Sequence, residues 1–398
     1  MLTNIKSTLR GLINSMFSVI FSEYNFLDDY TVKKLGRGLF HYYVGYYDID
    51  PLHEETAEIL CHRIDAKFTK DIEPEYGDIG LISPLDGNFT KLTETRALNW
   101  QLASRAQWLN KDSIIFNDIE NEMQVSKVLD ITTKKIIKTY ERPFWAISPN
   151  GRYGTSLNFQ RIKQRRPGYG YKGSNIDQEK ERIVLFELNT GVNKFVFDLE
   201  EIFEEINFDA KNNDPYLNHI AWSPCSTKLL TIFHYEDRIN NKPRCVFPIV
   251  FDLSTNAWNL IDTSGFFSHH VWLNDNDLLA YIEHKNNTKF CIWNKKDGWI
   301  ALNGSIPSTD GHPSPVLENE KIIIDSYPNR LGKMRLYLAS VNPNHRFKEI
   351  GYVMNIAQYK GPLRCDLHPR FSNKHSTVIC DIPGRNGRRI LIIEGSYA

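Results

Sequence analysis

Paired cysteines are the first feature that this 398-residue sequence lacks. Its six cysteines are scattered, form no Cys-x-x-Cys pair and mostly stand in apolar, strand-like runs. This spacing excludes a small fold held together by disulfides and indicates free, buried thiols in a reducing compartment. We therefore expect a cytoplasmic protein, with the periplasm as the alternative.

An excess of charge of either sign is also missing. Lys+Arg and Asp+Glu number 48 each, which argues against a surface that wraps a polyanion and against a nucleic-acid partner. The local exception is the basic run 161–166, which contains Arg161 and Arg166. This run suits an acidic ligand, and a solvated loop is the alternative interpretation.

Long hydrophobic runs are absent as well. The strongest candidate, residues 11–21, follows Lys6 and Arg10 and resembles the apolar core of a signal peptide. Eleven residues cannot span a bilayer, and no small-x-small cleavage site follows them. We predict no transmembrane segment and assign residues 1–34 to an N-terminal helical extension, with a signal peptide as the alternative.

Helical periodicity is scarce after this extension and is convincing only over residues 198–206. Most of the remaining sequence consists of runs of four to six residues that are rich in β-branched and aromatic side chains and are bounded by Asn, Asp, Gly or Pro. Examples are residues 113–116, 228–233 and 321–325. Such runs are typical of strands, so we predict an all-β fold.

The strands recur in repeats, each beginning at an aromatic residue followed by a turn such as Ser-Pro. Seven such anchors are spaced about 54 residues apart on average. Four-stranded units at this period indicate a β-propeller. We predict seven blades over residues 35–398, with six or eight as alternatives, and a strand from residues 32–43 that completes the last sheet. The anchors are Pro51, Asn110, Pro149, Pro224, Asn274, Leu317 and Asn373.

Histidine occupies one equivalent position, five residues before the anchor, in the last four repeats. The first strand of each propeller blade lines the central channel, so residues at one position of successive repeats are expected to converge near the axis. Chance register among 12 histidines is the alternative. The four residues are His219, His269, His312 and His368.

This convergence suits a divalent metal ion. Imidazole and thiolate ligands favour zinc, whereas a set dominated by oxygen favours manganese or iron. A closed site would be structural, and an open position would allow Lewis-acid chemistry. The predicted ligands are His269, His312, Cys365 and His368, with Asp325 as a further oxygen ligand.

A second group of residues suits proton transfer. His219 and His234 belong to one repeat, and Arg238 follows four residues later. Histidine is a base near neutral pH, and arginine pairs with carboxylates through two hydrogen bonds. β-Elimination next to a uronic acid needs both, because the C5 proton is too weakly acidic until the neighbouring carboxylate is neutralised.

The remaining candidate residues complete this site. A phenol of the loop 166–171 could protonate the leaving oxygen, and a rigid aromatic turn is the alternative interpretation of that loop. Four arginines are candidates for binding an acidic substrate. The phenols are Tyr169 and Tyr171, and the arginines are Arg161, Arg166, Arg364 and Arg370.

Several stretches resemble the motifs of oligogalacturonate lyases and ulvan lyases. They include Ser-His-His-Val-Trp at 268–272, Asp-Gly-His-Pro-Ser at 310–314 and Arg-Cys-Asp-Leu-His-Pro-Arg at 364–370. The likeness extends over most of the chain from about residue 35 and implies a seven-bladed propeller. The resemblance to oligogalacturonate lyases further implies a manganese ion held by three histidines and a glutamine.

The resemblance also implies roles for single residues. By motif, His269 and His368 match two metal histidines, Cys365 matches the glutamine, and Arg370 matches the third histidine. One ligand is thus lost and one is changed, which shifts the expected ion from manganese to a zinc-like ion completed by His312 or Asp325. The catalytic arginine and histidine of the family fall on Arg238 and His234.

Three classes of function therefore compete. The leading hypothesis is a metal-containing lyase, monomeric or a small homo-oligomer, that acts on an acidic oligosaccharide. The second is a non-catalytic carbohydrate-binding or assembly propeller with a structural metal, and the third is a general interaction scaffold. The region 99–117 contains no histidine, which disfavours activity on ulvan, and no nucleotide-binding motif supports a glycosyltransferase.

Overall fold

The computed structural model describes residues 23–69, 74–174, 176, 180–206, 208–237, 242–316 and 320–397. Within these ranges the strands form seven antiparallel sheets, six of four strands and one of five. The expectations of an all-β fold and of seven four-stranded repeats are confirmed. The expected helical extension over residues 1–34 is not confirmed, because residues 1–22 lie outside the described ranges and residues 24–26 and 30–35 are strands.

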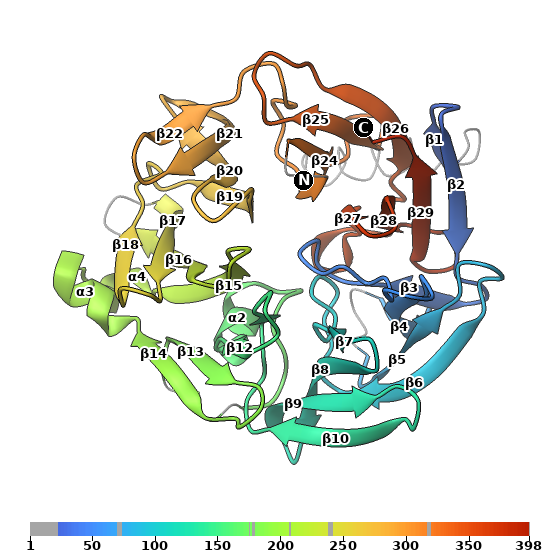
Figure 1. Cartoon of the computed structure of the whole chain (residues 1–398), viewed down its shortest axis with the longest axis horizontal. Helices are drawn as coiled ribbons and strands as arrows, with labels where there is room; N and C mark the ends of the chain where they lie inside the picture. The colour runs from blue at the N-terminus through green and yellow to red at the C-terminus, as the bar shows by residue number, and fades with distance from the viewer. Residues whose placement is uncertain are drawn as a thin grey trace, which may run out of the picture. The chain divides into compact units, whose positions relative to one another are not determined.

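The chain packs as two compact units. The first comprises the described parts of Met1–Glu94, Trp100–Ala103 and Asn303–Ala398, and the second comprises Thr95–Asn99 and the described parts of Ser104–Leu302. The first unit therefore combines described segments from the beginning and from the end of the sequence, and the second is nearly continuous in sequence (Figure 1).

Three sheets belong to the first unit, and each has the meander order expected of a propeller blade. The first sheet has β3 (Phe40–Tyr43), β4 (Ile59–Asp65), β5 (Gly77–Ile82) and β6 (Phe89–Thr95). The second has β23 (Pro313–Val316), β24 (Lys321–Asp325), β25 (Lys333–Ser340), β26 (Lys348–Met354) and β1 (Tyr24–Phe26). The third has β27 (Arg370–Ser372), β28 (Thr377–Ile382), β29 (Arg389–Gly395) and β2 (Tyr30–Leu35).

Two strands from the N-terminal region complete sheets that are otherwise made of C-terminal strands. β2 pairs with β29, with Tyr30 opposite Gly395 and Leu35 opposite Ile390, and β1 pairs with β26. The predicted completion of the last sheet is thus confirmed, although the strand is Tyr30–Leu35 and Phe40–Tyr43 begins the first sheet instead. This pairing covers the edge of β29, which would otherwise expose unpaired backbone groups.

The second unit contains the other four sheets. The first has β7 (Gln107–Asn110), β8 (Ser113–Glu120), β9 (Met123–Asp130) and β10 (Lys135–Tyr140), and the next has β11 (Ala146–Ile147), β12 (Tyr153–Ser156), β13 (Arg182–Glu187) and β14 (Asn193–Asp198). They are followed by β15 (Tyr216–Trp222), β16 (Lys228–Asp237), β17 (Lys242–Asp252) and β18 (Ala257–Leu260). The last has β19 (Phe267–Trp272), β20 (Leu278–His284), β21 (Asn287–Asn294) and β22 (Gly298–Ala301).

Short helices occur in connections between these strands. α2 (Phe159–Arg165) starts at Asn158, whose side chain accepts a hydrogen bond from the Arg161 backbone N–H and so caps the helix. α3 (Glu200–Ile206) and α4 (Ala210–Asn213) follow β14, and α3 confirms the helix expected near residues 198–206. The single-turn helix η1 (Gly361–Leu363) lies in the first unit. No described helix is both long and apolar enough to cross a membrane.

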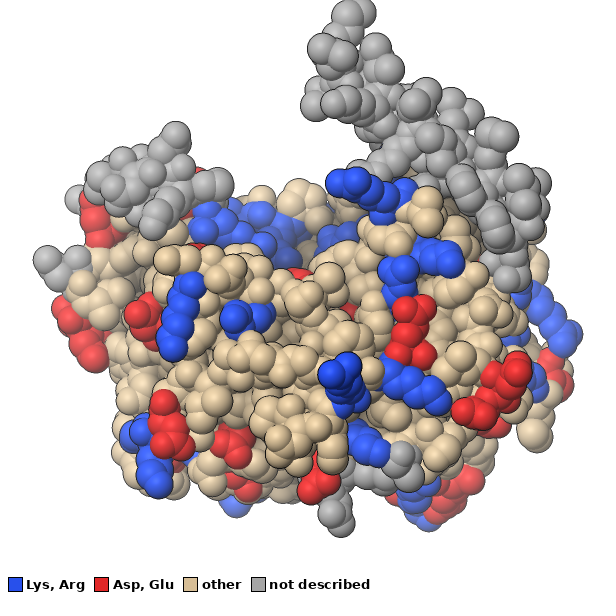
Figure 2. Space-filling view, turned by 90° about the horizontal axis from the view of Figure 1, so that it is seen from above, with Lys and Arg blue, Asp and Glu red and all other residues tan. Residues whose placement is uncertain are grey.

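The core lies between neighbouring sheets. In the first unit, β28 buries all six of its residues, and Val378 and Ile382 pack with Leu391, Ile393 and Ile323. Each such side chain contributes about 1.5–3 kcal/mol relative to an exposed one. β28 also carries one buried carboxylate, which is important for the site described below. Acidic and basic side chains occur side by side on the face shown in Figure 2, in agreement with the balanced composition.

Candidate functional site

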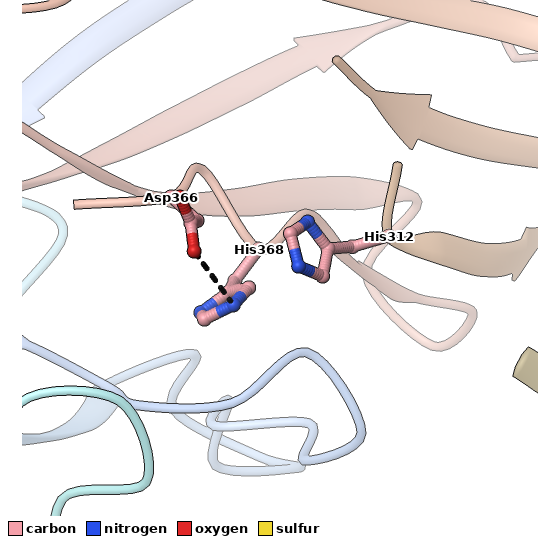
Figure 3. Close-up of side chains that lie close together, drawn as sticks. All are labelled: His312, Asp366 and His368. Atoms are coloured by element: carbon pink, nitrogen blue, oxygen red, sulfur yellow. Dashed lines mark ion pairs between the residues drawn. The ribbon is translucent and has the colours of Figure 1, made fainter. Parts of the chain in front are cut away.

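One group of potential metal ligands in the first unit consists of His312, Asp366 and His368 (Figure 3). His312 directly precedes β23, and the other two residues lie in the short segment before β27, which begins at Arg370. One ligand atom from each residue lies within 4.8 Å of the others. The exposed fractions are 1% for His312, 7% for Asp366 and 3% for His368, so these polar groups are almost entirely removed from water.

The orientation of the His312 ring is set by Asp325, at the end of β24. His312 Nδ1 lies 2.9 and 3.0 Å from the two carboxylate oxygens of Asp325. Since a carboxylate accepts, Nδ1 carries the proton and the lone pair is on Nε2. Burial alone would lower the pKa of His312, but the charges of Asp325 and Asp366 and the hydrogen bond to Asp325 raise it above its usual value.

His368 has the same tautomer for a different reason. Its Nδ1 lies 2.7 Å from the Gly45 carbonyl oxygen, which can only accept, so Nδ1 donates and Nε2 keeps the lone pair. Within the described residues, Nε2 is buried without a hydrogen-bond partner, and it lies 4.0 Å from Asp366 Oδ2. Burial, His312 and Arg370 lower the pKa of His368 well below its usual value, which keeps the ring neutral.

This arrangement fits a divalent cation. Two imidazole nitrogens and one carboxylate are a ligand set found in zinc sites with an open position. Metal-bound histidines almost always donate their other N–H to a carboxylate or a backbone carbonyl, as His312 and His368 do here. Asp366 is itself oriented by Arg364, whose Nε donates to it over 2.7 Å. The buried lone pair on His368 Nε2 is the atom that most needs a partner.

The other predicted ligands are placed differently. Cys365 is buried, and burial raises the pKa of its thiol to about 12, so the thiolate that binds metals is disfavoured. Both oxygens of Asp325 accept hydrogen bonds from the two ligand histidines. His269 lies in β19 of the second unit, where its Nδ1 is 3.3 Å from Ser268 Oγ.

Asp366 was not predicted as a ligand. The signal was present in the sequence, because Asp366 stands two residues before His368 in a run rich in polar side chains. Two predicted substrate-binding arginines of this region make internal contacts. Arg364 binds Asp366, and Arg370, only 2% exposed, donates to backbone carbonyls and to the carboxylate of Asp381.

The second unit contains a separate histidine cluster centred on His219 in β15. Its ring centroid lies 5.0 Å from that of Trp145, 6.2 Å from that of His270 and 6.3 Å from that of Tyr169. Burial and then the charge of Arg166, followed by neighbouring imidazoles, lower the pKa of His219 well below its usual value. At neutral pH the ring is therefore uncharged and able to accept a proton.

His234, the other predicted base, lies in β16 and is 1% exposed. Its ring stacks on Tyr216, with centroids 4.8 Å apart and an interplanar angle of 13°. Burial, Arg244 and Arg166 lower its pKa well below the usual value. Within the described residues its ring nitrogens have no hydrogen-bond partner. Arg238 lies outside the described residues.

The loop after α2 places its two tyrosines in different surroundings. Tyr171 is fully buried and stacks on Phe159 at 4.7 Å, its hydroxyl accepts a hydrogen bond from Asn117, and burial raises its pKa. This is the packing of a rigid aromatic turn. Tyr169 instead has the Arg166 guanidinium over its ring, with Cζ 4.3 Å from the centroid. Tyr169 therefore shares surroundings with His219, whereas Tyr171 anchors the loop.

Of the basic run 161–166, only part is available to an acidic ligand. Arg161 and Arg165 both form ion pairs with Asp214, which precedes β15. Their charges are therefore partly offset within the protein. Arg166 is half-buried and, as described above, lies beside Tyr169 and close enough to His219 to lower its pKa.

Comparison with solved structures shows the fold. An oligogalacturonate lyase in complex with manganese is similar to this chain with a TM-score of 0.63 at 11% sequence identity, over 94% of this chain and 96% of that one. An oligogalacturonate lyase from Vibrio parahaemolyticus has a TM-score of 0.60 at 11% identity, over 93% and 96% of the two chains. The β-propeller domain of the trilobed protease from Pyrococcus furiosus has a TM-score of 0.51 at 11% identity, over 94% and 95%.

No family model and no curated protein matches the sequence. The resemblance to oligogalacturonate lyases expected from the motifs is thus confirmed at the level of the fold. At 11% identity it does not extend to activity, and propellers of a protease have the same fold.

Proposed function

We propose that this protein is a lyase that cleaves uronic-acid oligosaccharides by β-elimination, with its proton-transfer site in the second unit. The observation that supports this most directly is the geometry of one cluster: the ring of the buried His219 lies 6.3 Å from that of Tyr169, and the guanidinium of Arg166 lies over the Tyr169 ring. His219 and Arg166 combine the base and the carboxylate-neutralising cation that the reaction requires. Arg166 takes the role first expected of Arg238, which lies outside the described residues.

The reaction follows from these groups. Arg166 pairs with the C6 carboxylate and stabilises the negative charge that develops on it as the C5–H bond breaks. His219 takes the C5 proton. The electron pair of the C5–H bond forms the C4=C5 double bond, and the C4–O4 bond breaks. The leaving O4 takes a proton from the phenol of Tyr169. No water is consumed, and the rings of Trp145 and Tyr169 limit its access to His219.

The metal belongs to the first unit in this proposal. His312, Asp366 and His368 hold one divalent cation there, and zinc is preferred over manganese because two of the three donors are imidazoles. When bound, the ion supplies a localised positive charge and an open position for an oxygen ligand. Nδ1 of His312 donates to Asp325, and Nδ1 of His368 donates to the Gly45 carbonyl. The lone pair of each ring is therefore on Nε2, which would bind the ion.

Turnover is tested by incubating the purified protein with a panel of uronate oligosaccharides and recording the ultraviolet absorbance of the unsaturated product. We expect absorbance with at least one substrate and none with the matching neutral oligosaccharides. A flat trace on every uronate would refute the lyase. The metal is tested separately by elemental analysis, which should give one divalent ion per chain.

A non-catalytic binding propeller is the second candidate, and the burial of both histidine bases favours it. His219 and His234 are only 4% and 1% exposed, so a substrate C5 proton reaches neither ring without some local movement. This candidate predicts binding of uronate oligosaccharides without product formation, and equal affinity in wild type and His219→Gln. Calorimetry on both proteins with the same oligosaccharide separates the two functions.

A further inference from the structure

We infer that Asp381 and Arg370, neither of which touches the proposed ion, are positioning residues that fix the tautomer of His368. The inference rests on the metal centre of the proposed function. It concerns the short turn that follows β3, because the carbonyl of Gly45 in this turn is the acceptor for His368 Nδ1. What holds this carbonyl in place decides which ring nitrogen of His368 is free to bind a cation.

Asp381 holds the turn from one side. It is a buried residue of β28, 2% exposed. Its Oδ1 accepts the backbone N–H of Val44 over 2.9 Å, and its Oδ2 accepts that of Gly45 over 3.2 Å. A buried carboxylate is costly unless its oxygens are satisfied, and here two backbone donors satisfy them. The two hydrogen bonds tie consecutive residues of the turn to a central strand.

Arg370 holds the same turn from β27. Its Nε donates to the Tyr46 carbonyl over 3.0 Å, and its Nη2 donates to the Gly45 carbonyl and, over 3.1 Å, to Asp381 Oδ2. The side chains of this ion pair are 1% and 2% exposed. A planar guanidinium makes these contacts simultaneously, which an ammonium group cannot do.

Gly45 allows the close approach that this geometry needs. Its φ is +124°, and a Cβ placed there would lie 2.9 Å from the Leu102 carbonyl oxygen. Only glycine adopts this backbone without strain. Its carbonyl oxygen therefore accepts from both Arg370 and His368 Nδ1, and the proton stays on Nδ1. In several proteins, buried ion pairs contribute more to the specificity of the conformation than to stability. Here the ion pair of Asp381 and Arg370 specifies the conformation of the turn at Gly45.

Asp381→Asn tests the inference. An Asn side chain must present its NH₂ group to Val44, Gly45 or Arg370, all of which are donors, so the turn loses at least one hydrogen bond. We expect the Nδ1-protonated form of His368 to give way to a mixture of tautomers, seen in long-range ¹H–¹⁵N spectra of metal-free protein labelled at histidine. Affinity for Zn²⁺, measured by competition with a chelating dye, should fall roughly 10–100-fold.

The control is Asp78→Asn in the same unit. Asp78 on β5 pairs with Arg63 on β4, with Arg63 Nη2 2.6 Å from its carboxylate. Arg63 stands opposite Tyr42 of β3, so this ion pair belongs to the same sheet as the turn, but the backbone N–H groups of Val44 and Gly45 donate to Asp381 and not to Asp78. This variant should leave the tautomer of His368 and the Zn²⁺ affinity unchanged. If Asp381→Asn does not fold, Arg370→Lys is measured instead. Lysine keeps the positive charge but loses the planar set of N–H donors. We therefore expect the same mixture of His368 tautomers and the same fall in Zn²⁺ affinity.

Unchanged tautomer and unchanged Zn²⁺ affinity in a folded Asp381→Asn or Arg370→Lys protein would overturn the inference. Failure of the proposed metal site is distinguishable from this result. If wild type binds no Zn²⁺ but Asp381→Asn still changes the tautomer, the positioning role stands and the metal proposal fails.

Discussion

His312 and His368 of the first unit face oxygen acceptors, whereas His219 of the second unit lies among aromatic rings and near a cation. His312 donates to Asp325 and His368 donates to Gly45, so each ring is held in a known tautomer. His219 instead lies beside Trp145 and within the field of Arg166. Of the four histidines at the repeated position, His219, His312 and His368 are at most 4% exposed, whereas His269 is half-buried.

The difference shows how one residue type at one position of a repeat acquires two kinds of chemistry. A carboxylate or carbonyl on Nδ1 directs the lone pair of Nε2 outwards and prepares the ring for a cation. A guanidinium nearby disfavours the imidazolium and keeps the ring neutral, so that its lone pair is able to accept a proton. The neighbours, rather than the histidine, decide between ligand and base.

The largest expected effect comes from removing the base. His219→Gln should lower the rate of elimination roughly 10²–10⁴-fold, since this is the usual contribution of a general base. Metal content should stay the same, because His219 is not among the ligands in the first unit. Product absorbance and elemental analysis on one preparation measure both. Loss of metal together with activity would show that the two clusters do not act separately.

Removing the carboxylate behind His312 should have the next largest effect. Asp325→Asn replaces one of the two carboxylate oxygens, which accept from His312 Nδ1 and from the backbone N–H groups of His312 and His368, with an NH₂ donor, so we expect Zn²⁺ affinity to fall about 10–100-fold. The pKa of His219, followed by NMR, serves as the control and should not move. Unaltered Zn²⁺ affinity would mean that the hydrogen bond from His312 Nδ1 to Asp325 does not affect metal binding by His312.

Lowering the pH tests what buried histidines do when burial outweighs the charge of any nearby carboxylate. Burial and Arg388 lower the pKa of His41 from 6.5 to about 4, and burial lowers that of His62 to about 4. Between these values the unfolded state binds more protons, so the unfolding free energy falls as pH falls from about 6.5 towards 4. At pH 5 the loss is about 2 kcal/mol for each histidine, at 1.36 kcal/mol per pKa unit.

Urea denaturation at pH 7 and pH 5 measures this loss. His62→Gln should reduce the difference between the two pH values by about 2 kcal/mol, because the variant has no proton to gain on unfolding. An equally steep pH dependence in His62→Gln would contradict the assignment of the lowered pKa to this ring.

The smallest effect concerns the cation of the second cluster. Arg166→Gln should raise the pKa of His219 towards its usual value, but it should remain lowered because burial is the larger cause. An NMR pH titration of the His219 ring in the metal-free protein measures this without substrate. If the pKa of His219 fell or stayed constant, Arg166 would not be part of its electrostatic environment.

The repeats explain why the fold was predictable. Period, turn residues and β-branched runs are local properties, and they gave the number of sheets and the strand from the N-terminal region that completes the last one. Its exact bounds, Tyr30–Leu35 rather than residues 32–43, depend on the register with β29. That register is a tertiary property, which a single strand does not specify.

The site was predictable only in residue type. His312 and His368 follow from the repeat, but the choice between Cys365, Asp325 and Asp366 as the third ligand depends on rotamers and hydrogen bonds. Asp325 is a partner of the histidines because β24 ends beside His312, and Cys365 is buried but does not belong to the group of clustered ligand atoms. Asp381 could not be recognised at all, because in sequence it is one polar residue within an apolar strand.

The pairing of β2 with β29 has a consequence for the order of events during synthesis. Tyr30–Leu35 emerges from the ribosome before the second unit, yet its partner Arg389–Gly395 emerges after it. The strands of the second unit are all made before this partner, so they can pair while the chain is still growing. The first unit has to wait until β29 has emerged. Proteolysis of ribosome-stalled chains that end before Arg389 should therefore find residues 104–302 protected and residues 30–35 cleavable.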